Sequence, residues 1–205
     1  MQTYSGIILA AGESRRIPTC KQLLKIHGKA MIEIVVEKAI KSRLDEVIVV
    51  LGHEFKTIQG YVKKYVGLAK PLKIVYNPDF KNGLSTSLKA GLKAVSSESG
   101  AVIFILADQP LIQVKTINQL MEVHSSMDCL IVVPTYRGRR GNPVLVDRKL
   151  FGEIFKLEGD IGARPLIKRY VDRVVYVATD DLGVIADIDT IEDYSALVAG
   201  KFGKR

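Results

Sequence analysis

The chain has 205 residues, of which 47% are hydrophobic, and a formal net charge of +8. This size suits one core, so we expect a single domain over residues 1–199 and a flexible tail over 200–205. The positive charge favours an anionic partner. No apolar run reaches the roughly 20 residues that a membrane-spanning helix needs, so we expect no membrane partner.

The cysteine content is low, with only Cys20 and Cys129. They form neither a CxxC pair nor a disulfide framework, and the N-terminus lacks a signal-peptide pattern. We therefore expect a cytoplasmic protein.

Short β-rich runs alternate with helical periods along the chain. The predicted strands are 6–10, 46–51, 72–76, 101–106, 130–134 and 173–177, and the predicted helices centre on 32–40, 84–95, 117–124 and 190–198. Several strands are continuously apolar, as in parallel strands covered on both faces. The alternation predicts a three-layer α/β fold with a mostly parallel sheet, whose ligands bind beyond the carboxyl ends of the strands.

The first strand ends in the small residues Ala10, Ala11 and Gly12, and cationic Arg15, Arg16 and Lys21 follow. Small residues let a ligand approach the backbone, and the amides and cations after them can bind phosphate. The segment matches neither the dinucleotide-binding nor the P-loop motif. A small-residue turn with solvated arginines is the alternative.

The third strand leads to Gly83 and then to the hydroxyls of Ser85, Thr86 and Ser87 at a predicted helix start. Ser85 can cap this helix. Three hydroxyls exceed what capping needs, so the helix start is also a candidate site for an anion or a base edge.

The fourth strand is followed at once by Asp108. A carboxylate there either pairs with a lysine or holds a hard cation such as Mg²⁺. A second candidate ligand is Asp189 or its near neighbour Asp187. Asp189 can also be explained as support for the helix cap at Thr190.

The fifth strand leads to a basic segment with Arg137, Arg139 and Arg140. It is either a hairpin tip or a lid for a second phosphorylated substrate. The three histidines have no metal-ligand spacing.

Taken in order, these segments resemble the molybdenum cofactor cytidylyltransferases, single-domain nucleotidyltransferases related to the molybdopterin guanylyltransferases. The resemblance rests on the segments 9–12, 21–24, 83–88, 107–110, 140–144, 159–164 and 187–193. It covers nearly the whole chain. It implies a Rossmann-like, glycosyltransferase-A-like fold.

The resemblance also implies a reaction. CMP would pass from CTP to the terminal phosphate of molybdenum-bound molybdopterin, giving molybdopterin cytosine dinucleotide and pyrophosphate, with Mg²⁺ as cofactor. A molybdenum hydroxylase would receive the product. By the same resemblance, the catalytic residues are Arg16, Lys21 and Asp108, the nucleotide-binding residues are Leu9, Ala10, Ala11, Gly12, Gly83, Ser85 and Ser87, the metal ligands are Asp108 and Asp189, and the acceptor-binding residues are Asn142 and Arg164.

Other functions stay open on the sequence. Guanylyl-transferring relatives usually carry glycine where Ala11 stands, which favours CTP, yet one methyl discriminates by only about 1–3 kcal/mol. Another nucleotide, another phosphorylated acceptor or a non-catalytic cofactor-binding accessory protein are the alternatives. No nucleic-acid partner is expected, because the basic residues are dispersed and form no recognised module.

Overall fold

The computed structural model describes residues 2–14, 16–17 and 19–202. One large sheet runs through the molecule in the order β10-β7-β9-β6-β1-β4-β5, with β8 paired to β7, and β2 and β3 form a separate small sheet. The strands are β1 (Thr3–Ala10), β2 (Lys25–Ile26), β3 (Lys29–Ala30), β4 (Glu46–Leu51), β5 (Leu72–Tyr76), β6 (Ser99–Leu106), β7 (Ile131–Tyr136), β8 (Arg139–Arg140), β9 (Val144–Asp147) and β10 (Val174–Ala178).

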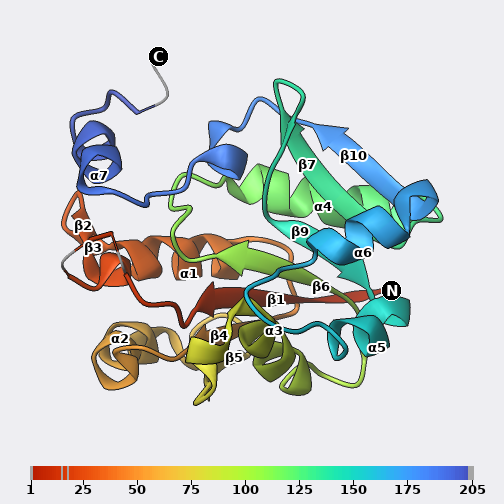
Figure 1. Cartoon of the computed structure of the whole chain (residues 1–205), viewed down its shortest axis with the longest axis horizontal. Helices are drawn as coiled ribbons and strands as arrows, with labels where there is room; N and C mark the ends of the chain where they lie inside the picture. Colours follow the sequence, from red (N-terminus) through yellow and green to blue (C-terminus); the bar gives the residue numbers. More distant parts are fainter. Residues whose placement is uncertain (1, 15, 18, 203–205) are drawn as a thin grey trace.

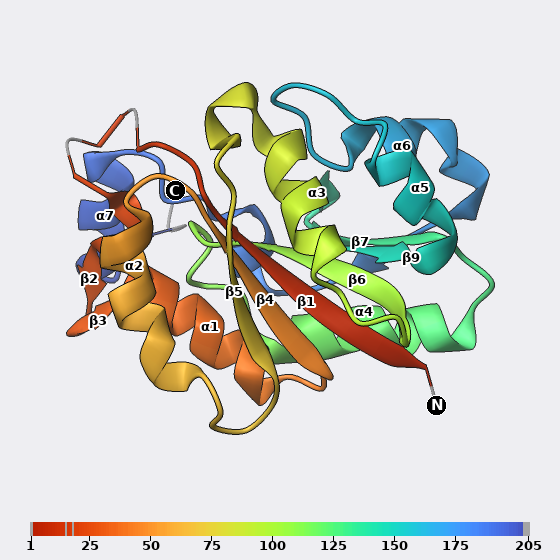
Figure 2. The ribbon, with the colours of Figure 1, turned by 90° about the horizontal axis from the view of Figure 1, so that it is seen from below.

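Helices cover both faces of the large sheet. Figure 2 shows α1, α2 and α4 on one face and α3, α5 and α6 on the other. The α-helices are α1 (Met31–Lys41), α2 (Phe55–Val62), α3 (Leu84–Lys93), α4 (Val114–Ser126), α5 (Phe151–Ile154), α6 (Arg164–Arg169) and α7 (Ile191–Val198). The short 3-10 helices are η1 (Lys21–Leu23), η2 (Lys63–Tyr65), η3 (Phe80–Asn82), η4 (Arg148–Leu150), η5 (Val171–Arg173) and η6 (Leu182–Ile185). The three layers predicted from the sequence are therefore confirmed (Figure 1).

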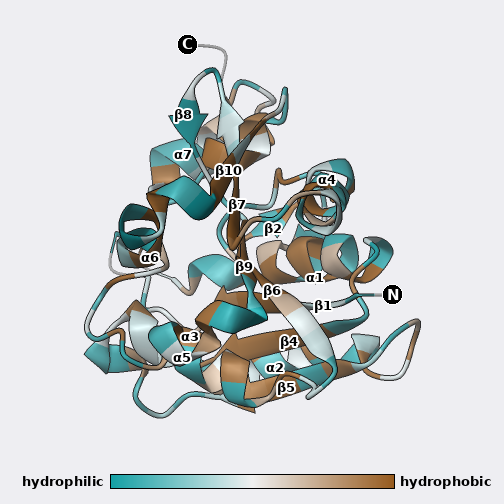
Figure 3. Cartoon of the chain, turned by 90° about the vertical axis from the view of Figure 1, so that its right-hand side faces the viewer, coloured by the Kyte–Doolittle hydropathy of each residue, from teal (hydrophilic) through white to brown (hydrophobic). Residues whose placement is uncertain are grey.

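The central strand β1 divides the core into two clusters. Ile8 and Ala10 pack with α1, α2 and α4, whereas Ile7 and Leu9 pack with α3, α5 and α6. Successive side chains of a strand point to opposite faces, so a continuously apolar strand serves both clusters. Figure 3 shows the resulting hydrophobic colouring of the central strands.

Strand β9 was not predicted. It lies antiparallel between β6 and β7 and pairs with both. Its Val144, Leu145 and Val146 are buried. The predicted basic segment is the hairpin that joins β7 to β8 just before this strand. The sheet is therefore mostly parallel with an antiparallel insertion.

The last helix begins as predicted. Thr190 Oγ1 accepts from the Asp193 backbone amide, and the Asp193 carboxylate accepts from the Thr190 amide, which forms a capping box. Helix α7 then packs Leu197 into a small cluster with Met31, Ile188 and Phe202. The predicted tail therefore includes Phe202, which packs there, while 203–205 lie outside the described residues. No helix in the described part of the chain is both long and apolar enough to cross a bilayer.

Candidate active site

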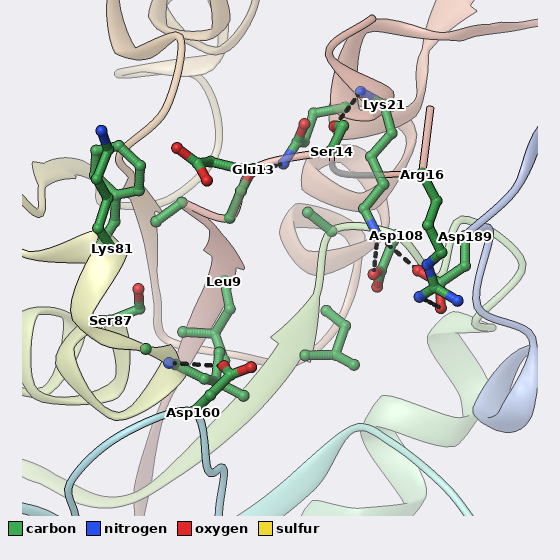
Figure 4. Close-up of a pocket in the computed structure, with 18 of the residues that line it drawn as sticks. Leu9, Glu13, Ser14, Arg16, Lys21, Lys81, Ser87, Asp108, Asp160 and Asp189 are labelled. Atoms are coloured by element: carbon green, nitrogen blue, oxygen red, sulfur yellow. Dashed lines mark hydrogen bonds and ion pairs between the residues drawn. The ribbon is translucent and has the colours of Figure 1, made fainter. Parts of the chain in front are cut away.

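A cavity of about 580 Å³ opens where β1 and β6 end. Leu9, Leu106 and Asp108 line it from the ends of these strands, and the loop after β1 and the start of α3 form its walls. Its size lies in the range typical of small-molecule sites. In Figure 4, Arg16, Lys21, Asp108 and Asp189 gather at one end, while Lys81, Ser87 and Asp160 lie across the cavity from them.

Two side-chain bonds hold the loop that follows β1. Ser14 Oγ accepts from the Lys21 backbone amide at 2.8 Å, and Gln22 Nε2 donates to the Gly12 carbonyl at 3.2 Å. The loop thus closes on itself around the small residues. This closure places Lys21, the first residue of η1, over the ends of the strands.

Lys21 joins two carboxylates from distant parts of the chain. Its Nζ lies 2.6 Å from Asp108 Oδ2 and 3.0 Å from Asp189 Oδ1. Arg16 Nη2 lies 2.7 Å from the second oxygen of Asp189. The four side chains form one charge cluster, in which each acid is paired with at least one base.

The pKa values within this cluster follow from these contacts. Burial acts to lower the pKa of Lys21, but the charges and hydrogen bonds of Asp108 and Asp189 outweigh it and raise that pKa. Burial acts to raise the pKa of Asp189, but bonds from Lys21 and Arg16 outweigh it and lower that pKa. Both groups therefore stay charged at neutral pH.

Asp187 lies beside the charge cluster without joining it. Its Oδ1 accepts from Gln109 Nε2 at 2.8 Å. Desolvation raises the pKa of Asp187, and the like charges of Asp108 and Asp189 raise it further. Asp189, and not Asp187, shares Lys21 with Asp108 and lines the cavity.

The donor set suits a hard divalent cation. Among the described residues, the buried Asp108 Oδ1 has no hydrogen-bond partner, and it lies next to the carboxylate of Asp189 across Lys21. The described residues contain no group of three or more His, Cys, Asp or Glu that could hold a metal. A cation here would therefore be bound by the two carboxylates and by substrate oxygens, which is how Mg²⁺ is typically held.

The start of α3 forms the opposite wall. Gly83, Leu84 and Ser87 line the cavity there, together with Asp160 from the loop before α6. The Leu84 amide donates to Asp160 Oδ1 at 3.1 Å, and the Ser85 amide donates to the Gly159 carbonyl at 3.2 Å. The loop before α6 thus accepts hydrogen bonds from the first two amides of α3.

Nine of the predicted site residues line this one cavity: Leu9, Ala11, Gly12, Arg16, Lys21, Gly83, Ser87, Asp108 and Asp189. They come from five segments of the chain. Most of the predicted site residues therefore share one cavity, whereas Arg15 lies outside the described residues.

Four predicted site residues lie elsewhere. Ala10 points to the opposite face of the sheet from Leu9, because strand side chains alternate. Ser85 is buried, its Oγ has no hydrogen-bond partner in the part of the chain that the structure describes, and the N-cap of α3 is Gly83, so Ser85 does not cap the helix. The backbone amide of Asn142 donates to the Val184 carbonyl, and Arg164 is exposed at the start of α6.

Six polar residues of the cavity were not among the predicted site residues: Glu13, Ser14, Gln22, Lys81, Asn82 and Asp160. Glu13 and Ser14 directly follow the predicted Gly12, so their proximity was a signal. Lys81 belongs to η3, and no pattern in the sequence marks its direction. Asp160 stands in a glycine-bracketed turn of which only the arginine was singled out.

Comparison with known proteins gives a consistent result. Residues 6–174 match the family described as MobA-like NTP transferase domain. The chain is 30% identical to the purine catabolism protein PucB of Bacillus subtilis, covering 92% of this chain and 93% of PucB. It is 28% identical to nicotine blue oxidoreductase of Paenarthrobacter nicotinovorans, covering 95% and 96%, and 24% identical to the molybdenum cofactor cytidylyltransferase of Escherichia coli, covering 95% of both.

Solved structures share the fold. The crystal structure of Rv0371c from Mycobacterium tuberculosis is 27% identical, with a TM-score of 0.81 over 97% of this chain and 98% of that one. Its complex with manganese gives a TM-score of 0.78 at 26% identity over the same shares. The match over residues 6–174, together with the cavity and its charge cluster, shows that the chain belongs to the MobA-like NTP transferase family and is a nucleotidyltransferase.

Proposed function

We propose that the protein transfers CMP from CTP to the terminal phosphate of molybdenum-bound molybdopterin. The products are molybdopterin cytosine dinucleotide and pyrophosphate. The observation that carries the proposal is the cluster of Lys21, Arg16, Asp108 and Asp189 at one end of the cavity. Similarity to the Escherichia coli cytidylyltransferase and the presence of Ala11 in the cavity wall support the choice of reaction.

The reaction needs no nucleophile from the protein. A phosphate oxygen of the acceptor forms the new bond to the α-phosphorus of CTP, and the bond from that phosphorus to the bridging oxygen of pyrophosphate breaks. Lys21 and Arg16 would neutralise the charge that develops on the leaving pyrophosphate. Such reactions depend chiefly on positioning and charge neutralisation.

Mg²⁺ is the cofactor in this proposal, held by Asp108 and Asp189. When bound, it would neutralise phosphate charge and polarise the reacting phosphate. The Oδ1 of Asp108, which has no hydrogen-bond partner among the described residues, supports a divalent cation at this place. A structural neighbour is known as a complex with manganese, which fits a divalent cation in this fold. Gly12 would let the triphosphate lie against the backbone, since a Cβ there would meet no atom of the described residues within 4 Å.

A second candidate is nucleotidyl transfer to a different acceptor. Two observations favour it. The predicted acceptor residues Asn142 and Arg164 lie outside the cavity, and two relatives that cover nearly the whole chain have names unrelated to a cytidylyltransferase.

Calorimetric titration of CTP and of GTP in the presence of Mg²⁺ tests the proposal, with wild type and Asp108→Ala. CTP should bind the wild type more tightly than GTP does. The variant should lose most of the gain in CTP affinity that Mg²⁺ gives the wild type. Asp172→Asn is the matched control, because Asp172 is exposed on η5 away from the cavity. Preference for GTP would contradict cytidylyl transfer, and an assay with molybdopterin then tests the acceptor.

A further inference from the structure

The wall formed by α3 carries a carboxylate in a fixed position. Gly83 has a φ of +106°, and a Cβ on it would lie 2.3 Å from the Gly159 carbonyl carbon and 2.5 Å from the Asp160 amide nitrogen. The loop therefore rests directly on the backbone of Gly83. Its contact is secured by the bonds from the Leu84 and Ser85 amides to Asp160 and Gly159.

This arrangement gives the two ends of the cavity different chemistry. A helix start usually attracts anions through its free amides. Here Asp160 already accepts from the Leu84 amide and adds a negative charge on the side that Lys81 also lines, whereas Lys21 and Arg16 lie across the cavity with Asp108 and Asp189 (Figure 4). Since the Leu84 amide is occupied, the triphosphate fits better at the other end, where Lys21, Arg16 and a divalent cation on Asp108 and Asp189 would contact it. The base is left to face Asp160.

Asp160 also has acceptor capacity to spare. The single hydrogen bond found for its carboxylate within the described residues is the one from Leu84 to Oδ1, and the residue is exposed to the cavity. A carboxylate only accepts hydrogen bonds. An amino group on a base is the matching donor, as in contacts of Asp or Glu to cytosine N4. Uracil instead has a carbonyl oxygen at C4, which a carboxylate repels.

We propose that Asp160 is a specificity residue that accepts a hydrogen bond from the amino group of the nucleotide base and so selects cytosine over uracil. The proposal rests on the proposed function, because it assumes that CTP fills this cavity. It assigns Asp160 to the base, whereas Asp108 and Asp189 remain at the phosphate end.

The test is calorimetric titration of CTP and UTP with Mg²⁺ and without acceptor, in wild type and Asp160→Asn. The asparagine keeps an oxygen for the Leu84 amide and offers an amino group to the base. CTP affinity should fall by about 10- to 100-fold, the size expected for a hydrogen bond to a charged group. UTP affinity should stay the same or rise.

Glu158→Gln is the matched control, because Glu158 lies exposed in the same loop and does not line the cavity. It should leave the ratio of CTP to UTP affinities unchanged. Thermal unfolding of all variants checks that the loop and α3 are intact. Asp160→Ala should also lose the preference for CTP, whatever its effect on stability.

An equal loss of CTP and UTP affinity in Asp160→Asn would overturn the proposal, because a merely structural contact or a contact to ribose affects both nucleotides alike. An unchanged ratio would overturn it as well. In both cases the binding of CTP to the wild type would leave the proposed function standing. Failure of the wild type to bind CTP would overturn both.

Discussion

The backbone amide of Ile188 donates a hydrogen bond to the backbone carbonyl of Asp108 at 2.9 Å. This bond ties the segment before α7 to the end of β6. It sets Asp189 beside Asp108, so that both carboxylates reach Lys21. The spacing of the two acids is therefore fixed by the backbone, and the side chains need little reordering to share a ligand.

The first prediction concerns Asp187 and Asp189, because the sequence alone did not decide which of them is the second metal ligand. Asp189→Asn should lower turnover by about 100-fold or more, in the range that follows loss of one electrostatic contact to the reacting groups. Asp187→Asn should change it by less than about fivefold, since Asp187 is bonded to Gln109 and stands outside the cavity. Pyrophosphate release measures both rates, and the reverse order of effects would make Asp187 the ligand.

The second prediction concerns Lys21. Its ammonium contacts one oxygen of each carboxylate, so a cation shared by the two acids must lie close to this like charge or displace it. Lys21→Met should bind Mn²⁺ without nucleotide about tenfold more tightly than wild type does, as expected from removing a like charge near the ion. The same variant should bind CTP more weakly.

Mn²⁺ binding can be followed by electron paramagnetic resonance. Lys115→Met is the control, because Lys115 is exposed on α4. Equal Mn²⁺ affinity in wild type and Lys21→Met would show that the lysine does not obstruct the carboxylates.

The third prediction compares two glycines. Gly83→Ala should destabilise the protein by about 1–3 kcal/mol, because its φ is positive and the new methyl would push the loop at Gly159 away. Gly60→Ala should stabilise it by about 0.5–1 kcal/mol, since Gly60 lies within α2 and a Cβ there meets no atom of the described residues within 4 Å. Urea unfolding gives both values, and CTP binding should weaken only in Gly83→Ala.

The fourth prediction concerns pH and Glu46, which is buried at the start of β4. Burial acts to raise its pKa, but bonds from Lys73, Ser5 and the Ser96 amide outweigh it and lower that pKa below the ordinary 4.5. The unfolded chain then binds the proton more readily, so this contribution to stability is present above about pH 4.5 and is lost as the pH falls through the lower folded value.

Glu46→Gln should therefore lower the free energy of unfolding by about 1–3 kcal/mol at pH 7. It should also flatten the fall in stability below pH 4.5. Urea unfolding at several pH values measures the difference. A constant difference between variant and wild type across the acid range would contradict the lowered pKa.

Much of the fold could be predicted from the sequence, because apolar runs mark buried parallel strands. The expected strands at 46–51 and 72–76 match β4 and β5 residue for residue. Strand β9 could not be separated from the preceding basic loop, since its four residues give too short a pattern. Its antiparallel direction depends on pairing with β6 and β7, which local sequence does not encode.

The candidate site likewise contains some residues that could be predicted from the sequence and others that could not. Asp108 follows the end of β6 closely, so its place could be predicted, because the carboxyl ends of parallel strands meet at one edge. Lys21 lies farther along the loop after β1 and was singled out by its charge and by the family resemblance. Asp160 could not be predicted, because its place depends on the loop resting on Gly83, a contact between residues far apart in the chain. Arg164 and Asn142 were singled out by motif alone, and their directions depend on how α6 and η6 pack.

The match to the family ends at residue 174, whereas Asp189 comes later, in the segment leading to α7. A chain shortened to the matched region would keep Asp108 and Lys21 but lose the second acid and Ile188, which anchors it. Domain boundaries drawn from sequence similarity alone would thus discard half of the carboxylate pair. Deletion studies of this protein should retain the chain at least through the end of α7 at Val198.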